Sequence, residues 1–228
     1  MKDRGKRPFN YMLVVGIAMA IVILIAFVNM LRTSESGTVG IGDVGIGEKV
    51  APFAVPIALS DLDGDANVDP DQACSVEGDD VLRICDYFRR PLVMSFWFTK
   101  GASSCIDQQD IFDEVARKYR RQAGFVSINV RDDRGRVRDL VRDHDWKVPV
   151  GYDRDGAVSN EYRVGGCPTF LFIRPGGVLE SAEIGSTDSE KLGSQVRSLI
   201  DGESKEAKQE APQGQATGRA GASGRSGI

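Results

Sequence analysis

Hydrophobic side chains along the chain follow two different periodicities. Residues 91–98 (PLVMSFWF) form an apolar run, which is typical of a strand buried on both faces of a sheet. In the next segment apolar side chains recur at helical intervals, at Ile111, Phe112, Val115 and Tyr119. Ser104 and Asp107 have the spacing of a capping box, so the pattern predicts a buried strand followed by a helix that begins near Ser104.

The rest of the pattern alternates between the same two kinds of element. It predicts a strand over 125–130, a short polar helix over 135–145, an extended piece over 149–152, a strand over 169–173 with a hairpin partner in 177–185, and a helix over 188–200. Strands separated by helices, followed by a hairpin and a last helix, describe an α/β sheet with helices on both faces.

An uncharged apolar segment precedes this domain at residues 11–31. At about 1.5 Å per residue it is long enough to cross the roughly 30 Å hydrocarbon core of a bilayer. Four basic side chains stand before it, Lys2, Arg4, Lys6 and Arg7, and Arg32 alone stands directly behind it. The positive-inside rule then predicts that residues 1–10 lie in the cytoplasm and that 33–228 lie outside. A cleavable signal peptide is the weaker alternative, because its apolar region would be shorter and would end at small residues.

Two segments without a core pattern flank the predicted domain. Residues 32–49 are rich in Gly and Ser, as in a flexible spacer. Residues 201–228 contain almost no large apolar side chain, so they are predicted to be disordered. A folded domain over 50–200 remains, and it includes an acidic insertion at 61–85.

Composition excludes several functions. The chain carries 29 Lys and Arg against 33 Asp and Glu, a net charge of −4, which argues against a general nucleic-acid partner. Its single histidine, His144, excludes a His-rich metal site and is interpreted as a surface residue at a helix end. The charged stretch 131–138 is interpreted as a solvated face.

Acidic side chains alternate along the insertion like the ligands of a calcium loop, at Asp61, Asp63, Asp65, Asn67 and Asp69. However, Ala66 stands where that motif has Gly, and Gln72 stands where it has Glu. A hairpin turn over 61–64 followed by a solvated acidic loop is the preferred interpretation, and calcium is the weaker one. No metal and no organic cofactor is therefore predicted.

Three sequence pieces, in this order, carry a resemblance to a known family. They are GEKVAPFAV (47–55), DYFRRPLVMSFWF (86–98) and YDRDGAVSNEYRVGGCPTFLFIRPGG (152–177), within which GCPTFL (166–171) is the strongest. The chain resembles the thioredoxin-like fold, in its membrane-anchored extracytoplasmic thiol–disulfide oxidoreductase branch. The resemblance implies a central mixed sheet flanked by helices, with Pro168 in a cis peptide bond facing the active-site turn. It also implies a bacterial cytoplasmic membrane as the location, and exported protein thiols or disulfides, or small thiols, as partners.

The active-site turn departs from this family. Its members carry Cys-x-x-Cys, whereas residues 96–105 here read FWFTKGASSC, with Ala102 in place of the first cysteine and Cys105 in place of the second. The loop is one residue longer, as in peroxiredoxins, whose peroxidatic cysteine corresponds to Cys105. The Pro and Thr of that peroxiredoxin loop would fall at Phe98 and Ala102, and its activating Arg near Cys167, and all three are missing. The resemblance to peroxiredoxins is therefore partial.

The resemblance brings Cys105 and Cys167 toward one site. If Ser104 caps the helix, Cys105 lies at the positive end of the helix dipole, which lowers the pKa of a thiol. Because Cys167 directly precedes Pro168, the resemblance implies that the two cysteines can form a redox disulfide. Cys105 would attack the substrate and Cys167 would resolve the mixed disulfide. The residues assigned to substrate binding are Pro168, Trp97, Ser104 and Thr169.

Less specific interpretations of these two cysteines stay open. They are a permanent disulfide or two buried thiols in a non-catalytic binding module, and a peroxidase in which Cys105 becomes a sulfenic acid. The other two cysteines, Cys74 and Cys85, are 11 residues apart and are predicted to form a structural disulfide, since neighbouring cysteines outside the cytoplasm are usually paired. A pairing of one of them with Cys105 or Cys167 also stays open.

Overall fold

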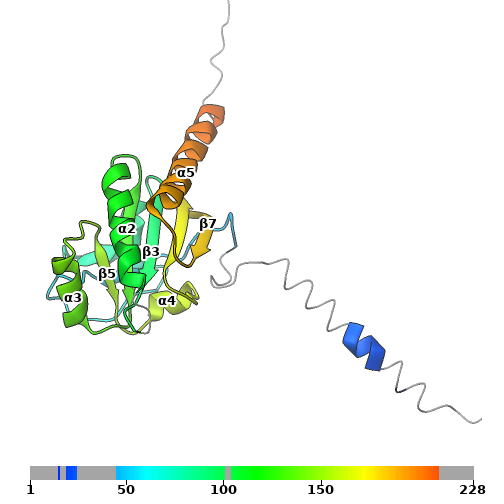
Figure 1. The fold of residues 1–228 in the computed structure, drawn as a ribbon, viewed down its shortest axis with the longest axis horizontal. Helices are drawn as coiled ribbons and strands as arrows, with labels where there is room; N and C mark the ends of the chain where they lie inside the picture. The colour runs from blue at the N-terminus through cyan, green and yellow to red at the C-terminus, as the bar shows by residue number, and fades with distance from the viewer. Residues whose placement is uncertain (1–14, 16–18, 25–44, 101–103, 211–228) are drawn as a thin grey trace, which may run out of the picture. The chain divides into compact units, whose positions relative to one another are not determined.

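The computed structural model describes residue 15 and residues 19–24, 45–100 and 104–210 (Figure 1). The chain divides into two units, 1–39 and 40–228, and every strand and helix named below belongs to the second. Most of the predicted transmembrane segment 11–31 lies outside the described residues, although 19–24 within it are helical. Among the described residues, no helix combines the length and the apolar character needed to span a bilayer.

The central sheet has five strands in the order β5-β4-β3-β6-β7. Their bounds are β3 Leu92–Trp97, β4 Gly124–Val130, β5 Val150–Asp153, β6 Thr169–Arg174 and β7 Val178–Ile184. Strands β3, β4 and β5 are parallel, whereas β6 is antiparallel to β3 and β7 is antiparallel to β6. The predicted mixed sheet is confirmed, and every residue of β3 is buried, as its apolar run predicts.

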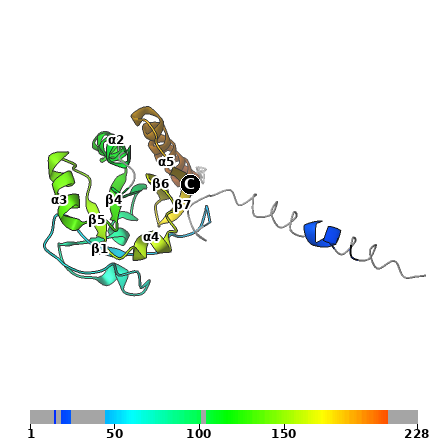
Figure 2. The same ribbon diagram turned by 60° about the horizontal axis from the view of Figure 1, so that its bottom comes forward.

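Two layers cover the sheet, because side chains of successive strand residues point to opposite faces. Val93 of β3 packs with apolar residues of α2 (Ser104–Tyr119) and α5 (Ser189–Glu210) on one face. Met94 packs on the other face, in the core cluster that contains Val55 and Tyr162. Figure 2 shows α2 and α5 above the sheet and β1 and α4 (Ala157–Glu161) below it.

The acidic insertion differs from the sequence prediction. Strands β1 (Ala54–Pro56) and β2 (Val81–Arg83) pair antiparallel, and they are joined by the whole of 57–80, which includes η1 (Ala73–Ser75). The predicted hairpin turn over 61–64 is therefore wrong. Within this segment Asn67 forms an antiparallel bridge with Ala54 of β1, and partners distant in sequence hold the residues before it. Arg134 and Arg138 donate to backbone carbonyls of 57–62, and Arg154 pairs with Asp63 and Asp65.

The alternating acidic side chains of this segment do not converge on one point. Within the described ranges, three or more His, Cys, Asp or Glu side chains nowhere come together as metal ligands would. The ion pairs of Arg154 account for two of the alternating carboxylates, at Nη1–Oδ1 3.0 Å to Asp63 and Nη2–Oδ1 2.7 Å to Asp65. Asp63 and Asp65 therefore connect this segment to the rest of the domain through Arg154.

Two helices also differ from their predicted bounds, and a third lies where none was predicted. Helix α3 spans Arg134–Asp143, because the side chain of Asp133 caps it by accepting from the Arg136 N–H. Helix α4 was not predicted, since five residues are too few to show a helical period. Helix α5 continues to Glu210, into the segment predicted to be disordered, because Glu, Lys, Ala and Gln favour a helix even without a core to bury. The remainder of that predicted tail lies outside the described residues.

Candidate functional site

The structure joins Cys105 and Cys167 in a disulfide, with their Cα atoms 5.9 Å apart, a separation within the usual range for bonded cysteines. Cys105 lies in the first turn of α2, and Cys167 lies just before β6, 62 positions further along the chain. The peptide bond between Cys167 and Pro168 is cis. The disulfide therefore links two segments that only the fold brings together.

The strand register explains why these two cysteines meet. Strands β3 and β6 run antiparallel, and Phe96 near the end of β3 pairs with Thr169 at the start of β6. The residues just after β3 therefore lie beside the residues just before β6. The Cys167 Sγ is accordingly 4.0 Å from the backbone oxygen of Phe98.

The two sulfur-bearing residues differ in exposure. Cys105 is 0% exposed, whereas Cys167 is partly exposed. Ile184 of β7 lies beside the Cys167 segment, because a Cβ added to Gly166 would be 2.7 Å from the Ile184 Cγ2. Ile184 is 41% exposed, so an accessible apolar side chain lies beside Gly166, the residue that precedes Cys167, and sequence reasoning missed it.

Three of the four residues assigned to substrate binding do not face solvent. Trp97, Pro168 and Thr169 are buried, and only Ser104 is exposed. Thr169 donates its hydroxyl to the Gly166 backbone oxygen at 2.8 Å, and Trp97 packs edge-on against Trp146 with ring centroids 5.3 Å apart. In the disulfide-bonded form the domain therefore encloses these three side chains, and Ser104 is the one of the four that faces solvent.

Cys167 packs against the cluster formed around Trp97. This buried cluster therefore lies against the Cys167 end of the disulfide on its interior side. His144, which ends α3, is a surface residue as predicted, and its Nδ1 lies 2.8 Å from the Asp110 Oδ1. The same oxygen accepts from the Trp146 Nε1 at 2.7 Å. This contact ties the surface pair to the aromatic cluster.

A buried carboxylate holds the chain where β3 leads toward α2. Asp132 is 6% exposed, and it accepts from the Thr99 N–H at 2.6 Å, the Thr99 Oγ1 at 2.9 Å and the Asn129 Nδ2 at 2.8 Å. The Tyr152 hydroxyl donates to the backbone oxygen of Asp132 at 2.8 Å. Burial raises the pKa of Tyr152, which keeps this hydroxyl protonated as a donor. The interpretation of 131–138 as a solvated face is therefore wrong for Asp132.

Asp132 acts on the peptide unit that faces Cys167. The N–H of Thr99 and the C=O of Phe98 belong to one trans peptide group, in which they point in opposite directions. Asp132 accepts from the N–H, and the carbonyl oxygen lies 4.0 Å from the Cys167 Sγ. The carboxylate thus fixes the orientation of the carbonyl beside the disulfide.

Asp153, at the end of β5, gives a pH-dependent prediction. Burial raises the pKa of Asp153, although the N–H groups of Val158 and Ser159 donate to its carboxylate. Because the pKa of Asp153 is higher in the folded than in the unfolded state, its protonation stabilises the fold. This stabilisation is complete below the pKa of the unfolded state and is lost as the pH rises through the pKa of the folded state. Relative to Asp153→Asn, the wild type should therefore gain free energy of unfolding when the pH falls from 7 to 4. Urea denaturation at both pH values measures this difference, and no relative gain would contradict the assignment.

Cys74 and Cys85 form the second disulfide, with Cα atoms 5.6 Å apart. Cys74 is exposed, whereas Cys85 is partly buried against the core cluster on the β1 side of the sheet. The bond closes the short loop that contains β2 and is remote in sequence from the Cys105–Cys167 pair. Its position suits a structural bond that holds the insertion.

Replacing both Cys74 and Cys85 by alanine should lower the free energy of unfolding by about 2 to 3 kcal/mol, the loop-entropy value for a ring of this size. Urea denaturation without reductant measures the loss. The activity of the other cysteine pair serves as the control and should be unchanged. A loss below about 0.5 kcal/mol would show that the bond does not constrain the unfolded chain.

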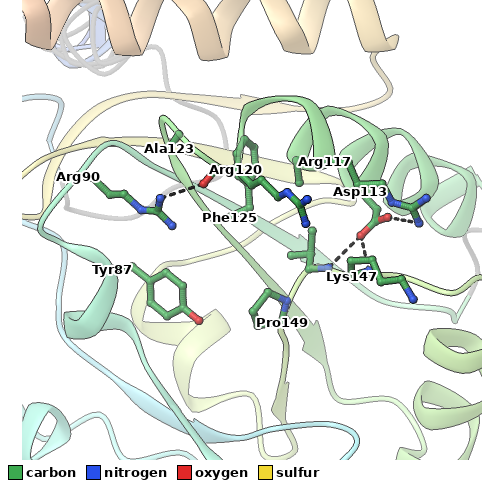
Figure 3. A pocket seen from close by; sticks show the side chains of 11 residues that line it. Tyr87, Arg90, Asp113, Arg117, Arg120, Ala123, Phe125, Lys147 and Pro149 are labelled. Atoms are coloured by element: carbon green, nitrogen blue, oxygen red, sulfur yellow. Dashed lines mark hydrogen bonds and ion pairs between the residues drawn. The ribbon is translucent and has the colours of Figure 1, made fainter.

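A basic pocket of about 170 Å³ lies at the opposite edge of the sheet (Figure 3). Its lining residues come from the segments that lead into β3, β4 and β5, from the start of β4, and from the second half of α2 and the residue after it. None of these lining residues is a cysteine. The cationic lining side chains are Arg90, Arg117, Arg120 and Lys147. Asp113 is neutralised there, because it pairs with Arg117 at 2.7 Å and accepts from the N–H groups of Lys147 and Val148 at 2.6 and 2.9 Å. The pocket is therefore separate from the disulfide site.

A mixed sheet with a disulfide between the first turn of α2 and the residue before a cis proline defines a thioredoxin-like protein with an altered active-site turn. The model of the AhpC/TSA family matches residues 49–182. The match covers more than half of the chain, so the chain belongs to the AhpC/TSA family.

Two curated relatives bear the name thiol-disulfide oxidoreductase ResA. The one from Oceanobacillus iheyensis is 22% identical over 112 residues, which is 49% of this chain and 58% of the relative. The one from Bacillus cereus is 26% identical over 113 residues, which is 49% of this chain and 64% of the relative. The chain thus spans less than two thirds of the length of each.

Solved structures share the fold at low identity. A putative thiol:disulfide interchange protein DsbE from Chlorobium tepidum is 19% identical with a TM-score of 0.56, over 69% of this chain and 99% of that one. A DsbF homologue from Corynebacterium diphtheriae is 17% identical with a TM-score of 0.54, over 73% of this chain and 94% of that one. These likenesses support the thioredoxin-like fold.

Proposed function

We propose that this chain is a membrane-tethered, extracytoplasmic thiol–disulfide oxidoreductase that works through Cys105 and Cys167. The observation that carries the proposal is the disulfide between these two residues, because Cys105 lies in the first turn of α2 and Cys167 directly precedes the cis proline. The partial exposure of Cys167 lets a substrate sulfur reach the bond. The names of the two curated relatives agree with this chemistry.

The reaction is thiol–disulfide exchange. A substrate thiolate attacks one sulfur of the pair, a mixed disulfide forms, and the other enzyme sulfur leaves as a thiolate. A second substrate thiolate then attacks the substrate sulfur of the mixed disulfide and releases the second enzyme sulfur. Two electrons and two protons pass from the substrate dithiol to the enzyme pair, and the reverse sequence reduces a substrate disulfide. The exchange needs no metal or organic cofactor.

Residues 11–31 support the proposed location. Their length, their lack of charge and the basic residues ahead of them support a single span of the cytoplasmic membrane, with residues 33–228 outside. Within that segment, residues 19–24 are helical and their larger apolar side chains are more than half exposed. Exported proteins with thiols or disulfides, or small thiols, are the substrates that such a tether makes accessible.

The test is oxidation of a fluorogenic dithiol peptide by the oxidised chain of residues 1–228. We expect one peptide disulfide per chain in a first turnover, and continued turnover when glutathione disulfide is supplied. Hydrogen peroxide consumption is measured in parallel. Peroxide-dependent turnover without disulfide exchange would instead indicate a peroxidase, and the absence of both reactions would leave only a binding module.

A further inference from the structure

The two sulfurs of the Cys105–Cys167 disulfide are not equivalent toward an incoming thiolate. Thiol–disulfide exchange requires access to the sulfur that is attacked. Cys105 is 0% exposed, while Cys167 is partly exposed. We infer that Cys167 is the sulfur that bonds to the substrate and that Cys105 is the leaving and resolving thiolate. This inference rests on the proposed function, and it reverses the roles that the sequence analysis gave to the two cysteines, in which Cys105 attacks the substrate and Cys167 resolves the mixed disulfide.

The position of Cys105 suits a leaving group. It lies in the first turn of α2, a helix of 16 residues, where the helix dipole and the free backbone N–H groups stabilise a thiolate. A thiol of lower pKa leaves faster in exchange. Asp107 shares this first turn, but it is exposed, so solvent screens its charge.

The surroundings of Cys167 disfavour a thiolate there. Its sulfur lies 4.0 Å from the Phe98 carbonyl oxygen, which accepts hydrogen bonds and carries partial negative charge. Asp132 fixes this carbonyl by accepting from the N–H of the same peptide group at 2.6 Å. Cys167 is therefore a poor leaving group. The exposure of the two cysteines and their electrostatic surroundings both favour attack on the Cys167 sulfur with Cys105 as the leaving thiolate.

The exchange proceeds in two steps. A substrate thiolate attacks the Cys167 Sγ, the bond between Cys105 and Cys167 breaks, and Cys105 departs with the electron pair as a thiolate. A second substrate thiolate then attacks the substrate sulfur bonded to Cys167, and Cys167 takes a proton from solvent. In the reverse direction, the Cys105 thiolate attacks the Cys167 sulfur of the mixed disulfide and expels the substrate thiolate.

The experiment adds glutathione to the oxidised chain of residues 1–228 and stops the reaction at early times with an acid-stable alkylating reagent. Mass spectrometry then shows which cysteine carries glutathione and which carries the alkyl group. We expect glutathione on Cys167 and alkyl on Cys105 in at least about tenfold excess over the opposite isomer, as the stabilisation of a thiolate at a helix start provides. The Cys105→Ser and Cys167→Ser variants, each joined to glutathione, provide the two reference isomers.

The other possible results would contradict either the inference alone or the proposed function as well. Glutathione mainly on Cys105, or equally on both, would overturn the inference and leave thiol–disulfide exchange intact. A disulfide that does not react with glutathione at all would overturn both the inference and the proposed function. Because the measurement uses the wild-type chain, it does not depend on the folding of a variant.

Discussion

Replacing Cys105 or Cys167 by serine should lower the rate of dithiol-peptide oxidation by at least about a hundredfold, because each substitution removes a sulfur that takes part in the covalent step. Both variants should fold, since serine is close in size to cysteine at these positions. Stopped-flow fluorescence of the peptide measures the rate, and circular dichroism checks the fold.

The matched control for these variants is Cys74→Ser combined with Cys85→Ser. It removes the other disulfide of the chain and should retain the wild-type rate at a temperature where it is folded. If this control lost the activity while the Cys105 and Cys167 variants kept it, the redox pair would be Cys74–Cys85, to which we assign a structural role.

The largest expected loss of stability comes from Asp132→Ala. The substitution leaves the Thr99 N–H, the Thr99 hydroxyl and the Asn129 amide buried without the acceptor that they share. Losing hydrogen bonds to a buried charged group should lower the free energy of unfolding by about 3 to 5 kcal/mol. Urea denaturation monitored by tryptophan fluorescence measures the change.

Asp133→Ala is the matched control, because it removes the neighbouring carboxylate. Asp133 caps α3 through the N–H of Arg136, so its loss should cost only about 1 kcal/mol. If both variants lowered the free energy of unfolding equally, the buried hydrogen bonds of Asp132 would contribute no more to stability than the helix cap of Asp133.

The order of strands and helices could be predicted because each element has its own pattern. The apolar run that became β3 and the helical repeat that became α2 are both long enough to show their period. The segment 57–80 could not be predicted, because distant arginines of α3 and Arg154 hold it. No local pattern in a sequence reports such contacts.

The site was only partly predictable. The resemblance to a known family brought Cys105 toward Cys167, and the register between β3 and β6 supplies the physical reason for their contact. The burial of Trp97 could have been expected from the apolar run around it. Asp132 could not have been found, because its charged neighbours in sequence look solvated and its donor Thr99 lies 33 residues away.

The most direct test of the central claim is a redox titration of both disulfides in the chain of residues 1–228. The protein is equilibrated in glutathione or dithiothreitol buffers, alkylated and mapped by mass spectrometry. We expect Cys105–Cys167 to equilibrate at a clearly higher potential than Cys74–Cys85, because the start of α2 stabilises the Cys105 thiolate in the reduced form. A Cys105–Cys167 bond that does not form, or that is reduced only after Cys74–Cys85, would contradict a redox role for the pair.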